Sequence, residues 1–350
     1  MATGNFELLC LENPLLDIQG VGDEKLLAKY ELKANDAILA DPAKHAELYD
    51  DLIQNYGAKL IAGGAAQNTA RGAQYMLPPN STIYIGCIGR DKYGETLESI
   101  CKEAGVRTEY RYDDEQPTGR CGVVITGHNR SLCTDLAAAN CYKLEHLQSE
   151  KIWKLVQEAK VYYVGGYHLT VCVPAILALA EEAAKEDKLF ILNLSAPFIP
   201  QFFKEPLDQV LPYTDIIIAN ETEAAVFAEG HGLETKDVKE IAKYIAGLPK
   251  KNAKRQRTVV FTQATDPTVT AVAKEGGEVE VKEYPVHAIS SDLINDTNGA
   301  GDAFAGGFVA GIVAGESLAT SVDMGQWIAR LSIQELGPSY PSPRQTYTKS

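Results

Sequence analysis

The chain shows two different patterns of apolar and polar residues. From residue 144 onward, apolar runs of four or five residues alternate with amphipathic stretches of helical period. A short continuous apolar run is typical of a strand buried on both faces, and the intervening helices imply parallel pairing through right-handed crossovers. Two earlier runs, residues 6–11 and 82–88, have the same character. We therefore predict an α/β fold, a mostly parallel sheet flanked by helices on both faces.

A second pattern marks a smaller unit. Residues 106–112 and part of 121–126 alternate between apolar and polar side chains. A period of two is typical of half-exposed antiparallel strands. We assign these segments, with the less regular region before residue 63, to a small discontinuous β-rich lid. The predicted domains are a large domain of residues 1–15, 63–105 and 137–350, and a lid of residues 16–62 and 106–136.

Composition narrows the range of partners and compartments. A net charge of −14 argues against binding to nucleic acid or to an anionic membrane. The seven cysteines are odd in number and lack a C-x-x-C pair, which indicates a reducing compartment and no structural zinc. No segment approaches the length of a membrane span. We expect a monomer in the cytosol. The basic run at residues 250–257 also fits a nuclear-import signal, although a solvated loop is the simpler interpretation.

A glycine-rich turn at residues 296–302 precedes an apolar stretch that we predict to be a buried helix. The N–H groups and the positive dipole at the start of a helix can bind an anion such as a phosphate. The turn lacks the Lys-Ser/Thr pair of a P-loop, and Phe304 stands where a dinucleotide fingerprint needs a small residue. Asp302 can either cap this helix or accept a proton from a substrate hydroxyl.

Several polar residues lie close to predicted strand ends, where α/β proteins place ligand groups. Asp17 follows the first strand, and its carboxylate can hold two neighbouring hydroxyls of a sugar. Asn68 lies one turn beyond Gly63 and Gly64 and can bond a sugar hydroxyl. Arg130 lies on a predicted turn and can reach a phosphate. Each also fits a role without a ligand, as a turn aspartate, a solvated amide or a surface cation.

Two pairs of side chains follow later strands. Tyr167 and Phe198 can sandwich a planar base, although aromatic residues after strands more often close a core. Asn220 and Glu223 are one helical turn apart and can either hold a hydrated Mg²⁺ or form a capping pair. The residue types alone leave both alternatives open for each pair.

Two segments, residues 63–72 and 296–304, resemble the signature motifs of the ribokinase-like sugar and nucleoside kinases. The order of elements agrees with that family over nearly the whole chain. The resemblance implies a ribokinase-like fold and ATP-dependent phosphorylation of an alcohol, with Mg²⁺ as cofactor. Further stretches resemble the members that convert adenosine and ATP to AMP and ADP, namely residues 13–17, 129–132, 137–142 and 193–198.

The resemblance also implies roles for individual residues. Asp302 is the base for the 5′-hydroxyl, and Arg130 approaches the phosphates when the lid closes. The anion hole for the phosphoryl group consists of the N–H groups of Gly299, Ala300 and Gly301. The ribose hydroxyls are held by Asp17, Gly64 and Asn68. The residues around the adenine are Leu16, Leu132, Leu136, Tyr167 and Phe198. The ATP and Mg²⁺ side consists of Asn220, Glu223, Thr262 and Asn298, with Glu223 acting on Mg²⁺ through water.

The sequence departs from this family pattern at three places. Gln263 and Ala264 stand where many relatives have a glycine near the nucleotide, and His128 stands where an acidic residue is common. The tail at residues 335–338 also differs, so we predict no monovalent-cation site. Two rival functions stay open, a related kinase acting on inosine, guanosine or a free sugar, and an inactive nucleoside-binding regulatory protein. The two aromatic residues favour a base-bearing substrate, and an intact Asp302 favours an active enzyme.

Overall fold

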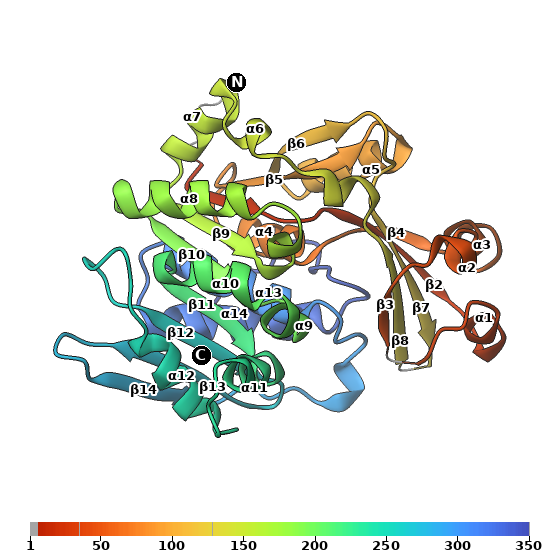
Figure 1. Ribbon diagram of the computed structural model, residues 1–350. Helices are drawn as coiled ribbons and strands as arrows, with labels where there is room; N and C mark the ends of the chain where they lie inside the picture. Colours follow the sequence, from red (N-terminus) through yellow and green to blue (C-terminus); the bar gives the residue numbers. More distant parts are fainter. Residues whose placement is uncertain (1–5, 35, 128, 350) are drawn as a thin grey trace.

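The computed structural model of the protein describes residues 6–34, 36–127 and 129–349. Within these ranges the chain forms a nine-stranded sheet and a separate five-stranded sheet, which lies to one side of it (Figure 1). Residues 1–5, at the start of the predicted large domain, and His128, one of the departures from the family pattern, lie outside the described residues.

The large sheet is mostly parallel, as the apolar runs predict. Its strand order is β14-β13-β12-β11-β10-β9-β1-β5-β6, and only β13 and β14 are antiparallel to their neighbours. The strands are β1 (Leu8–Leu11), β5 (Thr82–Gly89), β6 (Arg107–Asp113), β9 (Val161–Gly165), β10 (Leu189–Asn193), β11 (Ile216–Asn220), β12 (Thr258–Gln263), β13 (Asp266–Ala273) and β14 (Val279–Tyr284).

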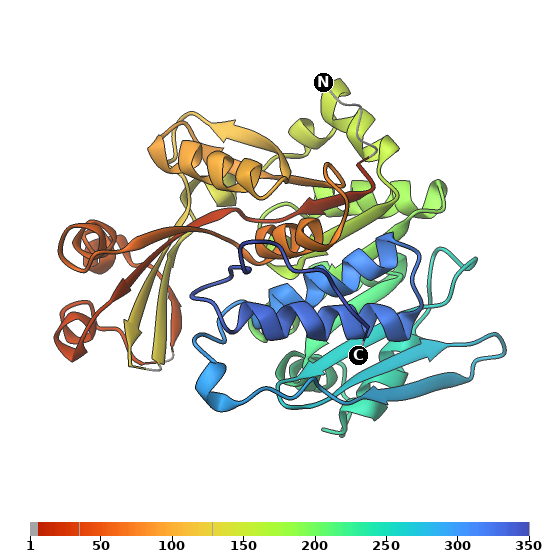
Figure 2. The same ribbon diagram turned by 180° about the vertical axis from the view of Figure 1, so that it is seen from behind.

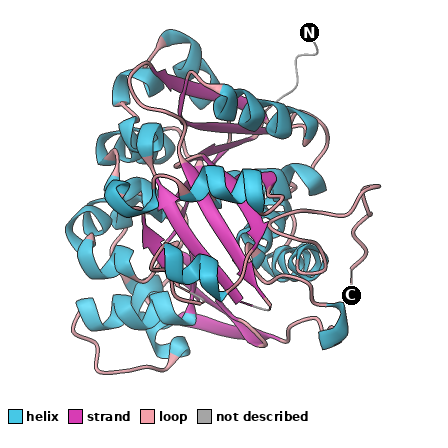
Figure 3. Ribbon diagram, turned by 90° about the vertical axis from the view of Figure 1, so that its right-hand side faces the viewer, coloured by secondary structure: helices cyan, strands magenta, loops and turns pink. Residues whose placement is uncertain are grey.

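Helices cover both faces of this sheet (Figure 3) because successive strand residues point to opposite faces. Leu9 and Leu11 pack with the core on one side, and Leu8 and Cys10 with the core on the other. The first face carries α6 (Leu144–Leu147), α7 (Glu150–Glu158), α8 (Val173–Lys185), α9 (Phe198–Phe202), α10 (Lys204–Val210), α11 (Glu221–Gly230) and α12 (Val238–Gly247). The second carries α4 (Ala65–Met76), α5 (Lys92–Glu103), α13 (Ala300–Val313) and α14 (Leu318–Ser332).

On the second face, α13 and α14 lie side by side (Figure 2). Short 3₁₀ helices occur at η1 (Ala137–Cys141), η2 (Gly166–Thr170), η3 (Leu211–Tyr213) and η4 (Ser291–Leu293). No helix in the described ranges is long and apolar enough to cross a membrane.

The small sheet has the order β3-β8-β7-β2-β4. Its strands and helices are β2 (Leu15–Val21), β3 (Ala37–Leu39), β4 (Lys59–Gly63), β7 (Arg120–Thr126), β8 (Asn129–Asp135), α1 (Glu24–Lys29), α2 (Pro42–His45) and α3 (Leu48–Asn55). Ile18 and Val124 pack with residues of α1 and α3 in a separate core. Because side chains alternate along a strand, Asp17 and Gln19 point to the other face, toward the large sheet.

One predicted lid segment is wrong. Residues 106–112 were expected to form an antiparallel lid strand, but β6 pairs in parallel with β5 at the edge of the large sheet. An edge strand is covered less completely than a central one, so the half-buried Arg107 and Arg111 lie on the same strand as the buried Tyr110. The alternation therefore reflects the edge position and not the lid. At the opposite side of the sheet, β13 pairs antiparallel with both β12 and β14, and β14 forms the edge.

The expectation of a solvated basic loop at residues 250–257 is also wrong for three of its cations. Lys250 pairs with buried Asp215, and Arg255 bonds the chain at Asp187 and Lys188. Arg257 is 1% exposed. Its guanidinium donates to five carbonyl oxygens at 2.6–3.2 Å, those of Leu211, Thr214, Ile245, Leu248 and Pro249. These carbonyls lie at and just beyond the ends of α12 and η3, where helix geometry leaves acceptors unpaired.

Substitution Arg257→Lys is expected to lower the free energy of unfolding by about 1–3 kcal/mol, because an ammonium has only three donors and no planar fork. Urea denaturation would measure the loss. Arg255→Lys is the matched control: Arg255 also bonds backbone oxygens, but its side chain is 27% exposed, so water can replace the lost bonds. Equal losses of unfolding free energy in the two variants would contradict the role assigned to the buried Arg257 hydrogen bonds.

Candidate active site

The residues of the predicted anion site lie at the start of α13. Gly299 is the N-cap and has a left-handed backbone with φ of 77°. A Cβ at this position would lie 2.6 Å from the Cβ of Pro338. Both the left-handed backbone and this close contact therefore require a glycine. The Ala300 N–H donates to the Thr297 carbonyl at 3.2 Å. Within the described residues, Gly299 and Gly301 keep unpaired N–H groups, so the turn offers two free donors where the sequence predicted three.

Asp302 lies on the first turn of α13 and faces α4. Its Oδ2 accepts a hydrogen bond from the Asn68 side-chain amide at 2.9 Å, and its backbone oxygen accepts one from Thr69 at 3.3 Å. Burial of the carboxyl raises its pKa to about 7, and the bond from Asn68 partly opposes that rise. A carboxylate with this pKa can accept a proton near neutral pH.

Asn68 is placed by the turn before α4. Gly64 has φ of 88°, and a Cβ there would lie 2.4 Å from the Asn13 carbonyl oxygen. The Asn68 oxygen accepts a bond of 3.4 Å from Arg71, which also donates to the Ala62 carbonyl at 2.7 Å. The sequence predicted that Asn68 bonds a sugar hydroxyl, but it did not predict the contacts of Asn68 with Asp302 and Arg71. Both amide atoms are already engaged, so Asn68 orients Asp302 as well as facing the site.

Asp17 lies on β2, opposite the glycine pair. A Cβ at Gly63 would lie 2.0 Å from the Asp17 Oδ1, so only glycine leaves room for the carboxylate. Burial raises the pKa of Asp17 to about 7; the charge of Arg71 lowers it and that of Asp302 raises it. Asp17, Gly64, Asn68 and Asp302 thus belong to one group of neighbouring residues, as the sequence predicted.

The aromatic pair does not form a sandwich. The rings of Tyr167 and Phe198 contact each other, with centroids 5.8 Å apart and a tilt of 41°. A base between two rings needs about 7 Å, two contacts of about 3.5 Å each. Phe198 begins α9 and is 39% exposed, so the pair forms one apolar wall and not two.

The three predicted leucines differ in exposure. Leu16 has no exposed surface and packs with Ala62 in the core, so it lines no open pocket in this conformation. Leu132 on β8 and Leu136 are partly exposed. Leu136 lines a hollow of about 360 Å³ between the small sheet and η1, together with Leu39, Ala40, Gln116, Thr134, Asp135, Ala137, Asn140 and Cys141.

Asn220 and Glu223 form the capping pair that was the alternative to a metal site. The Asn220 side chain accepts from the Glu223 N–H at 2.8 Å, and both Glu223 carboxylate oxygens accept bonds of 2.9 Å from Asn220. Burial raises the pKa of Glu223 to about 7. Thr262 pairs with Asn220 across β11 and β12, so both lie at the same sheet edge. No cluster of three His, Cys, Asp or Glu side chains suited to a metal occurs among the described residues.

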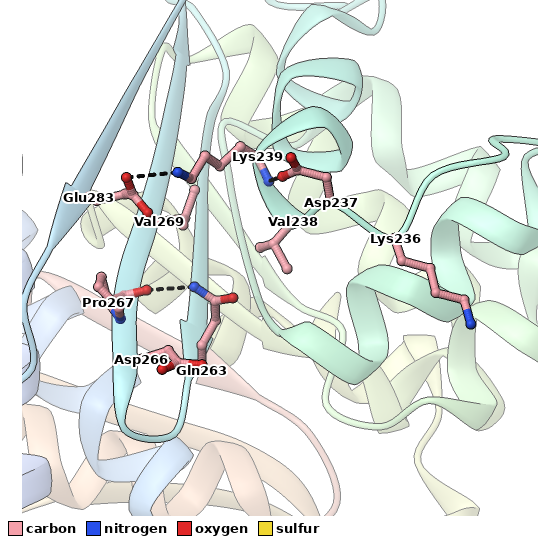
Figure 4. A pocket seen from close by; sticks show the side chains of 9 residues that line it. All are labelled: Lys236, Asp237, Val238, Lys239, Gln263, Asp266, Pro267, Val269 and Glu283. Carbon is pink, nitrogen blue, oxygen red and sulfur yellow. Dashed lines mark hydrogen bonds and ion pairs between the residues drawn. The ribbon is translucent and has the colours of Figure 1, made fainter.

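The departure at Gln263 and Ala264 keeps the backbone expected of a glycine, because Ala264 has φ of 46°. The Gln263 amide turns back to the Pro267 carbonyl at 2.6 Å (Figure 4). It borders a hollow of about 340 Å³ at the start of α12, lined also by Lys236, Asp237, Val238, Lys239, Asp266, Val269 and Glu283. Thr262 does not line this hollow.

Asp296 joins the small sheet to the anion-site turn. Its Oδ2 lies 3.3 Å from the Arg130 Nε and accepts from Gln19 at 3.4 Å and from the Gly337 N–H at 3.0 Å. Its Oδ1 accepts from the Asn298 N–H at 2.9 Å. We call these residues the Asp296 clasp. Asn298 therefore enters the site through its backbone, and Arg130 is held over the turn by an ion pair that sequence reasoning missed.

Four buried carboxyl groups with raised pKa values lie near one another here. Burial is the largest cause of the raised pKa of Asp17, Glu223 and Asp302, and it raises the pKa of Glu12 to about 8. The charge of Asp302 raises the pKa of each of the other three further. Glu12 was also missed, although the strand-end rule that selected Asp17 applies to it, because it follows β1 directly.

One known protein family matches most of this chain. The sequence profile described as "pfkB family carbohydrate kinase" matches residues 24–345. The chain belongs to the pfkB family. Its ribokinase-like fold, predicted from the two motifs, is thereby confirmed.

Other pfkB-family proteins resemble the chain over nearly its whole length. Adenosine kinase of Saccharomyces cerevisiae is 49% identical over 348 residues, which cover 98% of this chain and 99% of that protein. A crystal structure of Anopheles gambiae adenosine kinase in complex with P1,P4-di(adenosine-5) tetraphosphate has 43% identity and a TM-score of 0.89, and covers 97% of this chain and 99% of that one. Schistosoma mansoni adenosine kinase in complex with 2-fluoroadenosine has 35% identity and a TM-score of 0.88, with coverages of 97% and 98%.

The pKa of Asp302 has a consequence for stability. Because folding raises this pKa from 3.8 to about 7, the folded state keeps a proton that the unfolded chain loses between these values. The Asp302 contribution to the unfolding free energy thus falls as pH rises from 4 to 7. Asp302→Asn should be more stable than wild type at pH 8, and the gap should narrow toward pH 4 in urea denaturation. The exposed cap variant Asp237→Asn should show no such trend; a constant gap for Asp302→Asn would contradict the prediction.

Proposed function

We propose that the protein is an ATP-dependent adenosine kinase, which transfers the γ-phosphate of ATP to the adenosine 5′-hydroxyl and releases AMP and ADP. The observation that carries this is the bond between Asn68 and Asp302 at the open N-terminus of α13. A carboxyl group with a pKa raised to about 7 and two unpaired N–H donors at the start of the same helix support this proposal. The 49% identity to the S. cerevisiae enzyme over 98% of the chain supports the choice of substrate.

The transfer relies on positioning and charge stabilisation. Asp302 takes the proton of the 5′-hydroxyl while the oxygen attacks the γ-phosphorus in line with the leaving ADP oxygen. The N–H groups of Gly299 and Gly301 and the positive end of the α13 dipole stabilise the transferring phosphoryl group. Arg130 supplies a positive charge from the lid, exchanging its Asp296 partner for phosphate oxygens.

The nucleoside lies between the two sheets. Asp17 and the Gly64 backbone hold the ribose hydroxyls, while Asn68 contacts the ribose and orients Asp302. The wall formed by Tyr167 and Phe198 packs against the adenine. Leu132 and Leu136 pack near it, and Leu16 supports the site from the core.

ATP approaches along the edge formed by β11 and β12, at Asn220, Thr262 and Asn298. The buried Glu223 carboxylate is already engaged by Asn220, so it suits contact with Mg²⁺ through water, which that ion retains readily. When bound, Mg²⁺ neutralises charge on the ATP phosphates. A bound Mg²⁺ would favour the ionised form of the buried Glu223 carboxyl.

We further propose that the five-stranded sheet moves as a lid of residues 16–62 and 120–136. Closure excludes water, which would otherwise accept the phosphoryl group. One chain supplies all the assigned residues, so we propose an active monomer. Its seven cysteines are free thiols, and we place the reaction in the reducing cytoplasm, with the nucleus as a second location.

A coupled assay for AMP formation tests the function directly. Adenosine, inosine, guanosine and ribose are each supplied with ATP and Mg²⁺. Turnover of adenosine with the highest kcat/KM supports the proposal. A higher value for another acceptor identifies a related kinase, and adenosine binding without AMP formation identifies an inactive nucleoside-binding protein; either result contradicts the proposal.

A further inference from the structure

Glu12 is a buried carboxyl that the proposed reaction does not use. It follows β1 at the carboxyl-terminal edge of the sheet centre, between β5 and β9, and is 1% exposed. Its Oε2 accepts a hydrogen bond from the Ala66 N–H at 2.7 Å. Its Oε1 makes no hydrogen bond of regular geometry among the described residues, although the Tyr167 N–H and the Ser195 hydroxyl lie near enough to act on the carboxyl. Leaving such an atom unpaired is costly, so this side chain requires an explanation.

The carboxyl touches the two segments that carry the nucleoside-facing residues. Ala66 lies in the first turn of α4, two residues before Asn68. On the other side, a Cβ at Gly165 would lie only 1.7 Å from the Glu12 Oε1, and the three nearest atoms to it all belong to Glu12. Gly165 ends β9, two residues before Tyr167. The Glu12 side chain therefore fills the space between these segments.

A hydrogen bond also fixes the residues that follow β9. The Gly166 N–H donates to the Ser195 hydroxyl at 2.8 Å. Ser195 adopts a left-handed backbone with φ of 65°, which is strained for a residue other than glycine. The Ser195 hydroxyl and the Tyr167 N–H also lie close enough to Glu12 to lower its pKa. The carboxyl thus also lies near the segment that follows β10, through Ser195.

We propose that Glu12 is a positioning residue for the nucleoside: its buried side chain fixes the start of α4 relative to residues 165–167, so that Asn68 and Tyr167 meet the ribose and the base of the same molecule. This inference rests on the proposed function for the identity of the ligand. The contacts on which it depends are independent of that function.

The ionisation state of Glu12 matters for this role. Burial first, and then the charge of Asp302, raise its pKa to about 8; the Ala66 and Tyr167 N–H groups and the Ser195 hydroxyl lower it. The other titratable groups that face it are Cys10 on β1, Tyr84 on β5, and Tyr163 and Tyr167 at β9 and η2. Burial raises the pKa of all four above its ordinary value. Glu12 is therefore neutral at pH 7, and near pH 8 its ionisation adds a negative charge beside Asp302.

Kinetics of two variants as a function of pH test the role. Wild-type kcat/KM for adenosine should fall on the alkaline side with an apparent pKa of about 8. Glu12→Gln cannot ionise and should lose this alkaline limb while keeping the acid limb set by Asp302. Glu12→Ala should raise KM for adenosine by about tenfold, with a smaller change in kcat, because nucleoside contacts loosen while the base remains. An unchanged alkaline limb in Glu12→Gln, or a fall in kcat without a rise in KM in Glu12→Ala, would overturn the inference.

A paired substitution tests the contact itself. Gly165→Ala should raise KM for adenosine by about tenfold or more, since its methyl group collides with the Glu12 carboxyl. In a Glu12→Gly background the same methyl group enters vacated space, and its effect should shrink to about threefold or less. Gly247→Ala, whose Cβ would meet nothing within 4 Å, is the control and should behave as wild type. An equal effect of Gly165→Ala in both backgrounds would count against the inference.

The two proposals fail in different ways. If wild type forms no AMP from adenosine, the proposed function is wrong. The contact between Glu12 and residue 165 can still be tested in that case, because the effects of Glu12→Gly and Gly165→Ala on thermal unfolding should then be non-additive. If wild type is active but its alkaline limb survives in Glu12→Gln, the positioning role alone is wrong.

Discussion

Replacement of Asp302 by asparagine is expected to lower kcat for adenosine phosphorylation by about 10²- to 10⁴-fold, the usual contribution of a positioned general base. The amide keeps the shape of the carboxyl and can still bond Asn68, but it cannot take the proton of the 5′-hydroxyl. Adenosine affinity should stay within about threefold of wild type, because the lost interaction forms only in the transition state. Turnover and calorimetric binding of adenosine measure the two quantities.

The pH profile separates this role from a general loss of structure. Since the pKa of Asp302 is about 7, wild-type kcat/KM should fall as pH drops below 7 and the base becomes protonated. The residual activity of Asp302→Asn should lack this acid limb. Asp237→Asn, an exposed cap on α12, should retain wild-type turnover and pH dependence. Near-normal turnover in Asp302→Asn would exclude Asp302 as the base.

The second large effect is expected at Arg130. Its side chain is 13% exposed and lies 3.3 Å from Asp296, beside the turn that we propose receives the phosphoryl group. Arg130→Gln should lower kcat by about 10²- to 10³-fold, as when one stabilising donor is removed from a transition state. KM for adenosine should change little, because in the proposed mechanism Arg130 acts on the phosphates and not on the nucleoside.

The control for this variant is Arg90→Gln. Arg90 also pairs with an aspartate, Asp114, but both side chains are more than 60% exposed, at 62% and 77%. A surface pair of this kind contributes little, so Arg90→Gln should keep wild-type kinetics. Full kcat in Arg130→Gln would remove the lid arginine from the mechanism and leave the Asp296 clasp as a purely structural contact.

Local pattern predicted the buried strands because a strand covered on both faces must be apolar throughout, as β9 and β10 are. It misplaced β6, since an edge strand of a parallel sheet and a lid strand can show the same alternation. It also misread Arg257, because the carbonyls that bind it belong to separate segments, 8 to 46 residues away along the chain, which only the packed structure brings together. No local signal reveals which backbone acceptors a basic residue will reach.

Some features of the candidate site could likewise be predicted from the sequence, and others could not. Positions that require a left-handed backbone, such as Gly64 and Gly299, could be read from the sequence because few residue types adopt that conformation. Contacts between side chains could not be predicted from the sequence. Asn68 and Asp302 are 234 residues apart, and their bond depends on how α4 packs against α13. The direct contact of Tyr167 with Phe198 and the space filled by Glu12 likewise follow only from the packed structure.

The Asp296 clasp also bears on the order in which the fold comes together. One carboxylate gathers Gln19, Arg130 and Gly337, which lie 277, 166 and 41 residues away along the chain. Contacts between segments so far apart in sequence carry a loop-closure cost that must be met before they stabilise the fold. We therefore expect the clasp to form late in folding, after each sheet has built its own core.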